Sequence, residues 1–419
     1  MGDATASPTN HMRTLGQRVV ALVALALAPC LTQSARAQVA APIGNTFEGE
    51  NGIKIGEGRL HPYFDLELRF DSAAAVSGLN TTSEAITHFR PGFKLEMPPS
   101  LIQVAFNGYL DYVFYTGLLH PGDHDFSHFE TNVALDVFMN KQGAVEFDLG
   151  DRLTRSDRTS DVALGLGVLS FANELRAALP IHPGGGALEV TPSGSWLIER
   201  FQPLDSASRE SFAVLDYDNY HAGLDARWKF LPKTAVGIET GFDTRRYANP
   251  SQNKTPLLFK ARAALTGLLT SKLAVVAKVG WGQDFGGSGA SSVIGHFELN
   301  YLASVTSNFK VGSLRDFSAV PGIYGTYGDD RGYVDARLLL GGRLMLHGFA
   351  SYDYLTFYSG TNRNDQNITI DVGPEFQFTS WLIAAAGYDL GLRRSNAAVN
   401  GQVLNYTRHE VYLRVTFTY

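Results

Sequence analysis

Apolar side chains recur at every second position along most of this chain after residue 59. In the first such segment the apolar side chains share one face and the charged side chains share the other: Leu66, Leu68 and Phe70 against Asp65, Glu67 and Arg69. Successive side chains of a strand point to opposite faces, so this period indicates a strand with one apolar and one polar face. The chain holds eighteen such segments of about 10–14 residues, the length that a tilted membrane strand needs.

The connections between these segments alternate in length. Short turns such as 98–100 and 140–143 alternate with longer polar stretches such as 116–127 and 316–332. Bacterial barrels alternate periplasmic turns with external loops in this way, whereas a soluble β-sandwich has no reason to do so. The mean hydropathy of -0.07 is also too low for a bundle of membrane helices. The sequence therefore predicts an all-β fold, a transmembrane antiparallel up-and-down β-barrel of 16–18 strands. Eighteen is the expected count, and an even count would put both termini on the periplasmic side.

The N-terminus has the pattern of a secretory signal peptide. Arg13 and Arg18 precede an apolar run over residues 19–31, and Ala35 and Ala37 form a small-residue cleavage site. The run is too short to span a bilayer as a helix, and a buried N-terminal helix is the alternative. We expect a signal peptide at 1–37, a short periplasmic segment at 38–57 and the barrel at 58–419, with translation starting at Met1 or Met12.

The single cysteine, Cys30, lies within the predicted signal peptide. Pro29 before it is a poor match to a lipoprotein processing site, so we expect no lipid anchor. A mature chain without cysteine has no disulfide and no cysteine-ligated metal. Cleavage after Ala37 would change the net charge from -6 to -8, and an acidic balance argues against nucleic-acid binding.

The C-terminal segment is also typical of outer-membrane proteins. Val411, Leu413, Val415 and Phe417 share a face with the aromatic last residue, Tyr419. This resembles the terminal strand by which the barrel-assembly machinery recognises its substrates. We therefore expect that machinery and outer-membrane lipid among the partners, and the bacterial outer membrane as the location.

The polar face of an eighteen-strand barrel would line an aqueous channel. Charges of both signs fall on this face and no single-sign ladder is present, so strong ion selectivity is not indicated. The alternative for each residue is that it only solvates the interior and pairs across strands. The predicted pore-lining residues are Asp65, Glu67, Arg69, Arg90, Lys94, Glu96, Asp111, Glu130, Asp136, Asp225, Arg227, Glu239, Lys260, Arg262, Lys278, Glu298, Asp371, Glu375 and Arg414.

Tyrosines on the polar face suggest contact with sugars, because an apolar ring beside polar groups suits sugar stacking. Tyr109 and Tyr412 are the candidate stacking residues. Tyr63 and Tyr115 also fall on this face, but they fit better in the aromatic girdle at the membrane interface.

Catalytic and metal motifs are weak. The stretch 286–290 misses the GxSxG nucleophile pattern at its last position, and His409-Glu410 lacks the second histidine of HExxH. The loop at 120–125, with His128, could bind a cation, although solvated turn residues explain it better. We therefore predict no enzyme activity, no cofactor and no metal.

The segments at 228–234 and 267–282 resemble strand-turn segments of the β-barrel porin 2 family of outer-membrane barrels. The first reads Trp-Lys-Phe-Leu-Pro-Lys-Thr, and the stretch ending Phe70-Asp71-Ser72 also fits. The layout agrees along the whole barrel, but specific motifs agree only in the central part. Such barrels are often associated with exopolysaccharide export, so the resemblance implies secretion of a polysaccharide and a separate periplasmic polysaccharide-export protein as a partner.

Three functions are therefore open. A conduit for polysaccharide secretion is the leading hypothesis. The alternative is a diffusion or substrate-specific uptake porin for small solutes, which should have a long loop folded inward with opposed charges at a constriction. The loop 316–332, with Asp329, Asp330 and Arg331, is long enough for this. A structural or enzymatic barrel would need a loop-borne site that the sequence does not contain.

Overall fold

The structure is a computed structural model, and it describes residues 52–77, 80–98, 100–120, 126–141, 143–158, 168–204, 210–249, 255–286, 288–320, 325–358, 362–397 and 405–419. These residues form nineteen strands and one four-residue helix, α2 (Glu210–Ala213). The strands are β1 (Ile53–Ile55), β2 (Gly58–Ser77), β3 (Asn80–Glu96), β4 (Ile102–Tyr115), β5 (His128–Met139), β6 (Phe147–Ser156), β7 (Val168–Ala178), β8 (Leu188–Pro203), β9 (Tyr217–Leu231), β10 (Thr234–Tyr247), β11 (Leu257–Leu268), β12 (Leu273–Asp284), β13 (Ser291–Leu302), β14 (Asn308–Val320), β15 (Gly325–Leu340), β16 (Leu344–Phe357), β17 (Asn364–Thr379), β18 (Leu382–Ser395) and β19 (Tyr406–Thr418).

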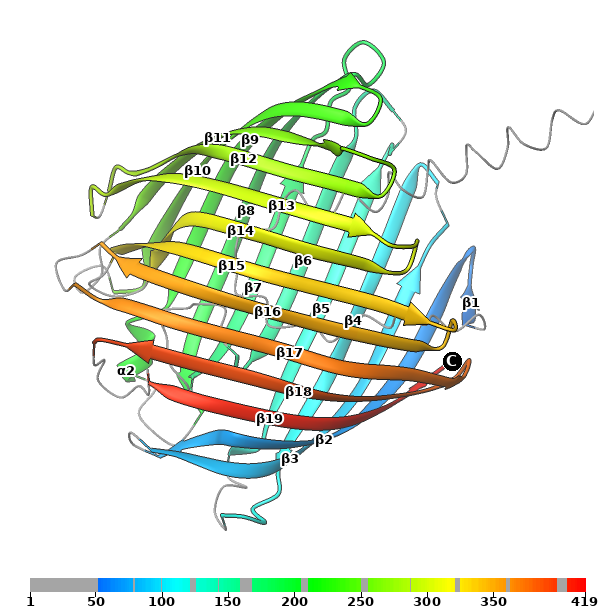
Figure 1. Cartoon of the computed structure of the whole chain (residues 1–419), viewed down its shortest axis with the longest axis vertical. Coiled ribbons are helices and arrows are strands. Elements are labelled where there is room, and N and C mark those ends of the chain that lie inside the picture. Colours follow the sequence, from blue (N-terminus) through cyan, green and yellow to red (C-terminus); the bar gives the residue numbers. More distant parts are fainter. Residues whose placement is uncertain are drawn as a thin grey trace, which may run out of the picture. The chain divides into compact units, whose positions relative to one another are not determined.

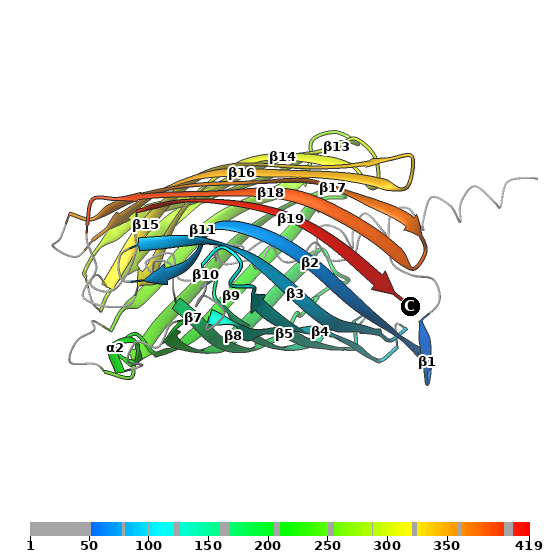
Figure 2. The ribbon, with the colours of Figure 1, turned by 90° about the horizontal axis from the view of Figure 1, so that it is seen from below.

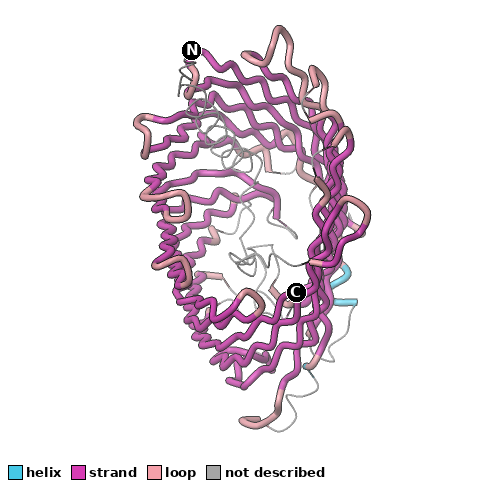
Figure 3. The backbone as a smooth tube through the Cα atoms, turned by 90° about the vertical axis from the view of Figure 1, so that its right-hand side faces the viewer, coloured by secondary structure: helices cyan, strands magenta, loops and turns pink. Residues whose placement is uncertain are grey.

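Eighteen of these strands form a closed antiparallel barrel. Each strand from β2 to β18 pairs with the next one along the chain, and β19 pairs with β2 from Glu410↔Asp71 to Thr418↔Tyr63. The two ends of the sequence therefore lie side by side, blue β2 next to red β19 (Figures 1 and 2). In Figure 3 the strands surround a common interior. The predicted fold class and the count of eighteen strands are confirmed, with the short β1 as an additional strand paired only to β2.

Contacts between distant strands identify the inner face. Lys260 on β11 bonds to Asp316 on β14, and Tyr247 on β10 bonds to the carbonyl of Val320 on β14. Side chains of strands three or four apart converge only on the concave side of a closed sheet. Because side chains alternate along a strand, the face of each strand follows from these contacts.

The outer face is apolar. Leu68, Val279 and Leu413 are 56%, 63% and 55% exposed, whereas Glu67 on the opposite face is 2% exposed. All four tryptophans of the chain are among the exposed residues: Trp196, Trp228, Trp281 and Trp381. An apolar outer band with aromatic side chains toward its ends and a polar interior is the arrangement of a barrel that crosses a lipid bilayer.

Polar pairs also lie on the outer face, and one of them joins β6 to β7. Asp151 on β6 lies between the outward-facing Leu135 and Leu175 of the neighbouring strands. The Asn173 amide donates a hydrogen bond of 3.0 Å to the Asp151 carboxylate. This bond satisfies part of the hydrogen-bonding capacity of two groups that face lipid.

The prediction of a long loop at 316–332 is wrong. β14 continues to Val320 and β15 begins at Gly325, so that Asp316, Asp329 and Arg331 lie within strands. β2 likewise continues to Ser77 and β3 begins at Asn80, so these two strands form a long hairpin. In both places apolar side chains support the extra length: Val320 and Tyr327 pack with Leu355 and Phe357, and Ala74 packs with Ile86, Val113 and Tyr115.

The short turns lie at one end of the barrel and the long connections at the other. β1 and the C-terminus mark the turn end, and α2 lies at the loop end (Figures 1 and 2). No helix in the described part of the chain is long and apolar enough to cross a membrane. The predicted signal peptide at 1–37 and most of the segment 38–57 lie outside the described residues, so cleavage and the periplasmic position of the termini stay predictions.

Two neighbouring alanines of β11 test the assignment of the faces. Ala263 pairs with the exposed Val279 on the outer face, and Ala264 points inward beside Lys278. We expect Ala263→Arg to lower the free energy of unfolding by about 2–4 kcal/mol, because it places a charge near the bilayer midplane. Ala264→Arg should cost less, because its charge stays in the polar interior. Urea unfolding in lipid vesicles measures both, and an equal loss from both changes would contradict the assignment.

Candidate functional site

The interior of the barrel carries the candidate functional site. Beside the first strands, Arg90 on β3 donates hydrogen bonds of 2.7 and 3.1 Å to the Asp111 carboxylate on β4. The same guanidinium lies 3.7 Å from Asp65 and 3.9 Å from Glu67 on β2. His88 Nδ1 is 3.0 Å from Asp111. One arginine therefore faces three carboxylates, all buried on the inner face.

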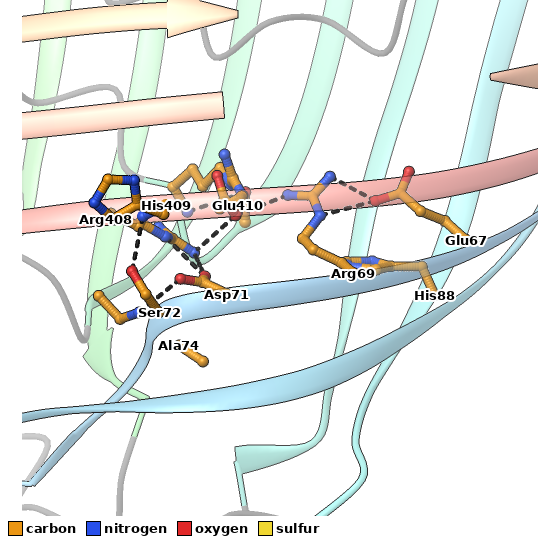
Figure 4. Close-up of polar contacts among 12 residues, drawn as sticks. Glu67, Arg69, Asp71, Ser72, Ala74, His88, Arg408, His409 and Glu410 are labelled. Carbon is orange, nitrogen blue, oxygen red and sulfur yellow. Dashed lines mark hydrogen bonds and ion pairs between the residues drawn. The ribbon is translucent and has the colours of Figure 1, made fainter. Parts of the chain in front are cut away.

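A second network lies where β2 meets β19 (Figure 4). Arg69 bonds to Glu67 through Nε at 2.9 Å and to Glu410 at 3.1 Å, while Arg408 bonds to Asp71 through Nε at 2.8 Å and lies 3.3 Å from Glu410. Glu410 also accepts a hydrogen bond from Arg158, which follows the end of β6. Three arginines thus converge on one carboxylate. Five strand-to-strand steps, β6 to β2 and then β19, separate Arg158 from Glu410 along the wall, so this contact crosses the interior.

A second contact between non-neighbouring strands lies at the loop end, between β10 and β14. The Tyr247 hydroxyl at the end of β10 donates a hydrogen bond of 2.9 Å to the carbonyl of Val320 at the end of β14. Tyr247 packs edge-on against Tyr217 at 5.9 Å, in an apolar cluster with Phe201 and Leu197. Side chains of non-neighbouring strands therefore narrow the interior near its loop end.

The other predicted pore-lining residues also have partners on the inner face. Lys260 and Arg262 bond to Asp316, which the sequence analysis did not select. The remaining contacts are Lys94 with Glu96, Asp136 with Arg176, Asp225 with Arg227, Glu239 with Lys278, Glu298 with Tyr333, Asp371 with His347, Glu375 with Arg414, and Glu130 with His128.

This pairing determines whether the inner wall carries a net charge of one sign. Each of the predicted charges has an opposite charge or a hydrogen-bond partner close by, and both signs are mixed along the wall. A ring of one sign, which would select strongly between anions and cations, does not occur among the described residues. Whether these residues line a conducting pore stays a prediction.

The two candidate sugar-stacking tyrosines lie under arginines. The Arg69 guanidinium is 5.6 Å from the centre of the Tyr412 ring, and the Arg90 guanidinium is 5.2 Å from that of Tyr109. Tyr412 is only 8% exposed, and its ring also lies over Gly387 of the neighbouring strand, where a Cβ would overlap it. A sugar could stack on this ring only after the arginine moved, so the geometry gives Tyr412 a packing role.

Three interior residues at the second network were missed by the sequence analysis. Arg408 and Glu410 lie on the inward face of β19, together with Tyr412. Extending the period-two pattern of this strand back toward the loop 393–406 would have found them. Arg158 had no local signal, because it follows a strand and its partner is 252 residues away along the chain.

Comparisons with known proteins give the following. No protein-family model matches the chain, and no curated protein matches it in sequence. The resemblance at 228–282 therefore remains an expectation. Among solved structures, the chain is similar to the outer membrane protein OpdK of Pseudomonas aeruginosa, with 12% identity, a TM-score of 0.46 and coverage of 86% of this chain and 98% of that one.

Two further structures are similar to the same extent. OccAB3 of Acinetobacter baumannii has 9% identity and a TM-score of 0.46, with 87% of this chain and 100% of that chain covered. The siderophore receptor PirA of Pseudomonas aeruginosa has 10% identity and a TM-score of 0.45, with 88% and 81% covered. At these identities the likeness concerns the barrel fold alone.

The packing role of Tyr412 can be tested at Gly387. Gly387→Ala should lower the free energy of unfolding by about 1–3 kcal/mol, the usual cost of overpacking, because the new methyl group meets the Tyr412 ring. In the Tyr412→Ala background the same change should cost less, because the overlap disappears. Unfolding of the three variants in one denaturant series measures the coupling, and additive effects would argue against direct packing.

Proposed function

We propose that this chain is an outer-membrane porin through which small polar solutes diffuse. The observation that carries this proposal is the contact of Arg158 with Glu410 across the interior. It brings a cation from the segment after β6 to a carboxylate on β19, where Arg69 and Arg408 also bind. A polar interior narrowed by opposed charges admits small hydrated solutes and excludes bulky ones.

The mixed charges of the wall support the same proposal. Conduction requires that a solute bind well enough to enter and weakly enough to leave. Because the wall charges are paired with one another, they offer a passing solute exchangeable hydrogen bonds and no strong fixed site. The solute class that fits is small, polar and of either charge sign.

Polysaccharide export is the second candidate. The sequence resemblance at 228–282 favours it, and an eighteen-strand barrel is wide enough for a hydrated polymer where side chains do not cross it. The contacts at the loop end count against it, because a polymer would have to displace Arg158 and the Tyr247–Val320 hydrogen bond.

The same proposal covers targeting and partners. Residues 1–37 would be removed after export, and the strand ending at Tyr419 would be the signal for the barrel-assembly machinery. A periplasmic polysaccharide-export protein is a partner only under the second candidate.

Arg158 provides the direct test of the proposed constriction. In planar bilayers, Arg158→Ala should raise the single-channel conductance and the size limit for neutral sugars, because it removes the side chain that crosses the interior. The matched control is Arg155→Ala, three residues earlier, whose guanidinium bonds to the Phe129 carbonyl on the outer face. An unchanged conductance for Arg158→Ala, or an equal change for both variants, would reject the proposed constriction.

A deletion strain separates the two candidate functions. For a porin, loss of the gene should slow the uptake of small polar solutes and leave surface polysaccharide at its normal amount. Radiolabelled solute uptake and quantitative staining of surface polymer measure the two properties in one culture. Loss of polymer with normal uptake would assign the barrel to export instead.

A further inference from the structure

Three potential metal ligands meet on the inner face near the loop end. His128 and Glu130 lie two residues apart on β5, and Asp157 follows β6. The imidazole nitrogen and one carboxylate oxygen from each acid lie within 4.8 Å of one another. The sequence analysis had grouped His128 with the loop 120–125, whose residues 121–125 lie outside the described part of the chain.

The orientation of His128 is unusual for a histidine without a ligand. Its Nδ1 is 2.8 Å from the Phe126 carbonyl, which can only accept, so Nδ1 carries a proton. The side chain is 7% exposed, and Nε2 has no hydrogen-bond partner in the described structure. Nε2 lies 3.6 Å from the Glu130 carboxylate. In the neutral histidine a buried lone pair therefore points at an acceptor, which is costly unless a cation lies between them.

The two acids lie close together, and among the described ion pairs neither is joined to a lysine or an arginine. The backbone N–H of Asp157 donates a hydrogen bond of 2.6 Å to Glu130 Oε1, which connects the segment after β6 to β5. Two arginines near this group form ion pairs with other carboxylates: Arg158 with Glu410, and Arg408 with Asp71. Two half-buried carboxylates thus lie beside one buried imidazole, and a divalent cation would balance their charge.

From this geometry we propose that His128, Glu130 and Asp157 bind a divalent transition-metal ion of the zinc class. One imidazole nitrogen and two carboxylate oxygens are ligands that zinc accepts, and three protein ligands leave a fourth position for water. Zinc–ligand bonds of about 2.0–2.2 Å place tetrahedral ligands roughly 3.5 Å apart, so the group would have to close by about 1 Å. The hydrogen bond from His128 Nδ1 to a backbone carbonyl is the outer-shell contact that metal-binding histidines commonly make.

Such a site would act on the segment that bears Arg158. The metal would fix Asp157 to β5 and so hold the neighbouring Arg158 in reach of Glu410. The metal site goes beyond the proposed porin function, and it would stand even if the barrel conducted another class of solute.

Metal binding to the intact barrel tests the proposal. The full-length, tag-free protein, folded in detergent and stripped with a chelator, is titrated calorimetrically with zinc chloride and, in separate runs, with calcium chloride. We expect one zinc ion per chain, and a loss of affinity of at least about tenfold in His128→Gln and in Asp157→Asn, since even outer-shell changes have this effect. His347→Gln is the matched control, because His347 also lies on the inner face beside an acid, Asp371, and it should bind zinc normally.

Three results would overturn the proposal. These are no zinc binding by the wild-type barrel, equal binding by wild type, His128→Gln and Asp157→Asn, and calcium binding at this group in place of zinc. The first would mean that His128 is a protonated partner of Glu130. Heat-modifiable mobility on gels checks that each variant is folded, and if His128→Gln fails this check, Asp157→Asn decides the question, because the hydrogen bond to Glu130 comes from the backbone of residue 157.

Discussion

The pairing of β19 with β2 is the contact on which the rest of the structure depends. Within a bilayer every backbone N–H and C=O must find its partner in the protein, so a sheet can cross lipid only when it closes on itself. The closing ladder runs from Glu410 and Asp71 to Thr418 and Tyr63, and the last residue adds a hydrogen bond from its N–H to the Pro62 carbonyl. Closure also brings Arg69 and Glu410 together, although 341 residues separate them. The interior network in Figure 4 exists because the barrel is closed.

The alternation of apolar and polar residues predicted the barrel well, because every strand has apolar side chains on its outer face and polar side chains on its inner face. It gave eighteen strands and put Glu67, Arg90 and Asp111 on one face, where the structure has them in contact. It failed where a strand continues beyond the membrane. In 316–332 polar residues such as Asp329 and Asp330 resemble a loop, but β14 and β15 remain paired through Asp316↔Asp329, and contacts among Val320, Tyr327 and Leu355 stabilise this extension.

The contacts that define the candidate site were beyond the reach of sequence periodicity. Periodicity assigns a side chain to a face, but it does not say which strand lies opposite or how far a side chain reaches. Arg158 meets Glu410 because of the order of six strands around the wall, and Tyr412 covers Gly387 because of the register between β18 and β19. The same limit explains His128, because its neighbour Asp157 follows the next strand, β6, and periodicity does not show that the two side chains lie close together.

The interior shows how many charges the inner face of a barrel can carry without forming a field of one sign. A buried carboxylate without a partner would pay a large desolvation cost, and Asp111, Asp316 and Glu298 are accordingly matched by arginine, by lysine with arginine, and by a tyrosine hydroxyl. Pairing lowers the electric field in the interior and leaves hydrogen-bonding groups whose own partners remain close. Where pairs join neighbouring strands they stiffen the wall, as Arg90 and Asp111 do. Where a pair joins distant strands, as Arg158 and Glu410 do, it narrows the interior. Under the proposed porin function, the same electrostatics that stabilises the barrel would then set the size of the solutes that pass.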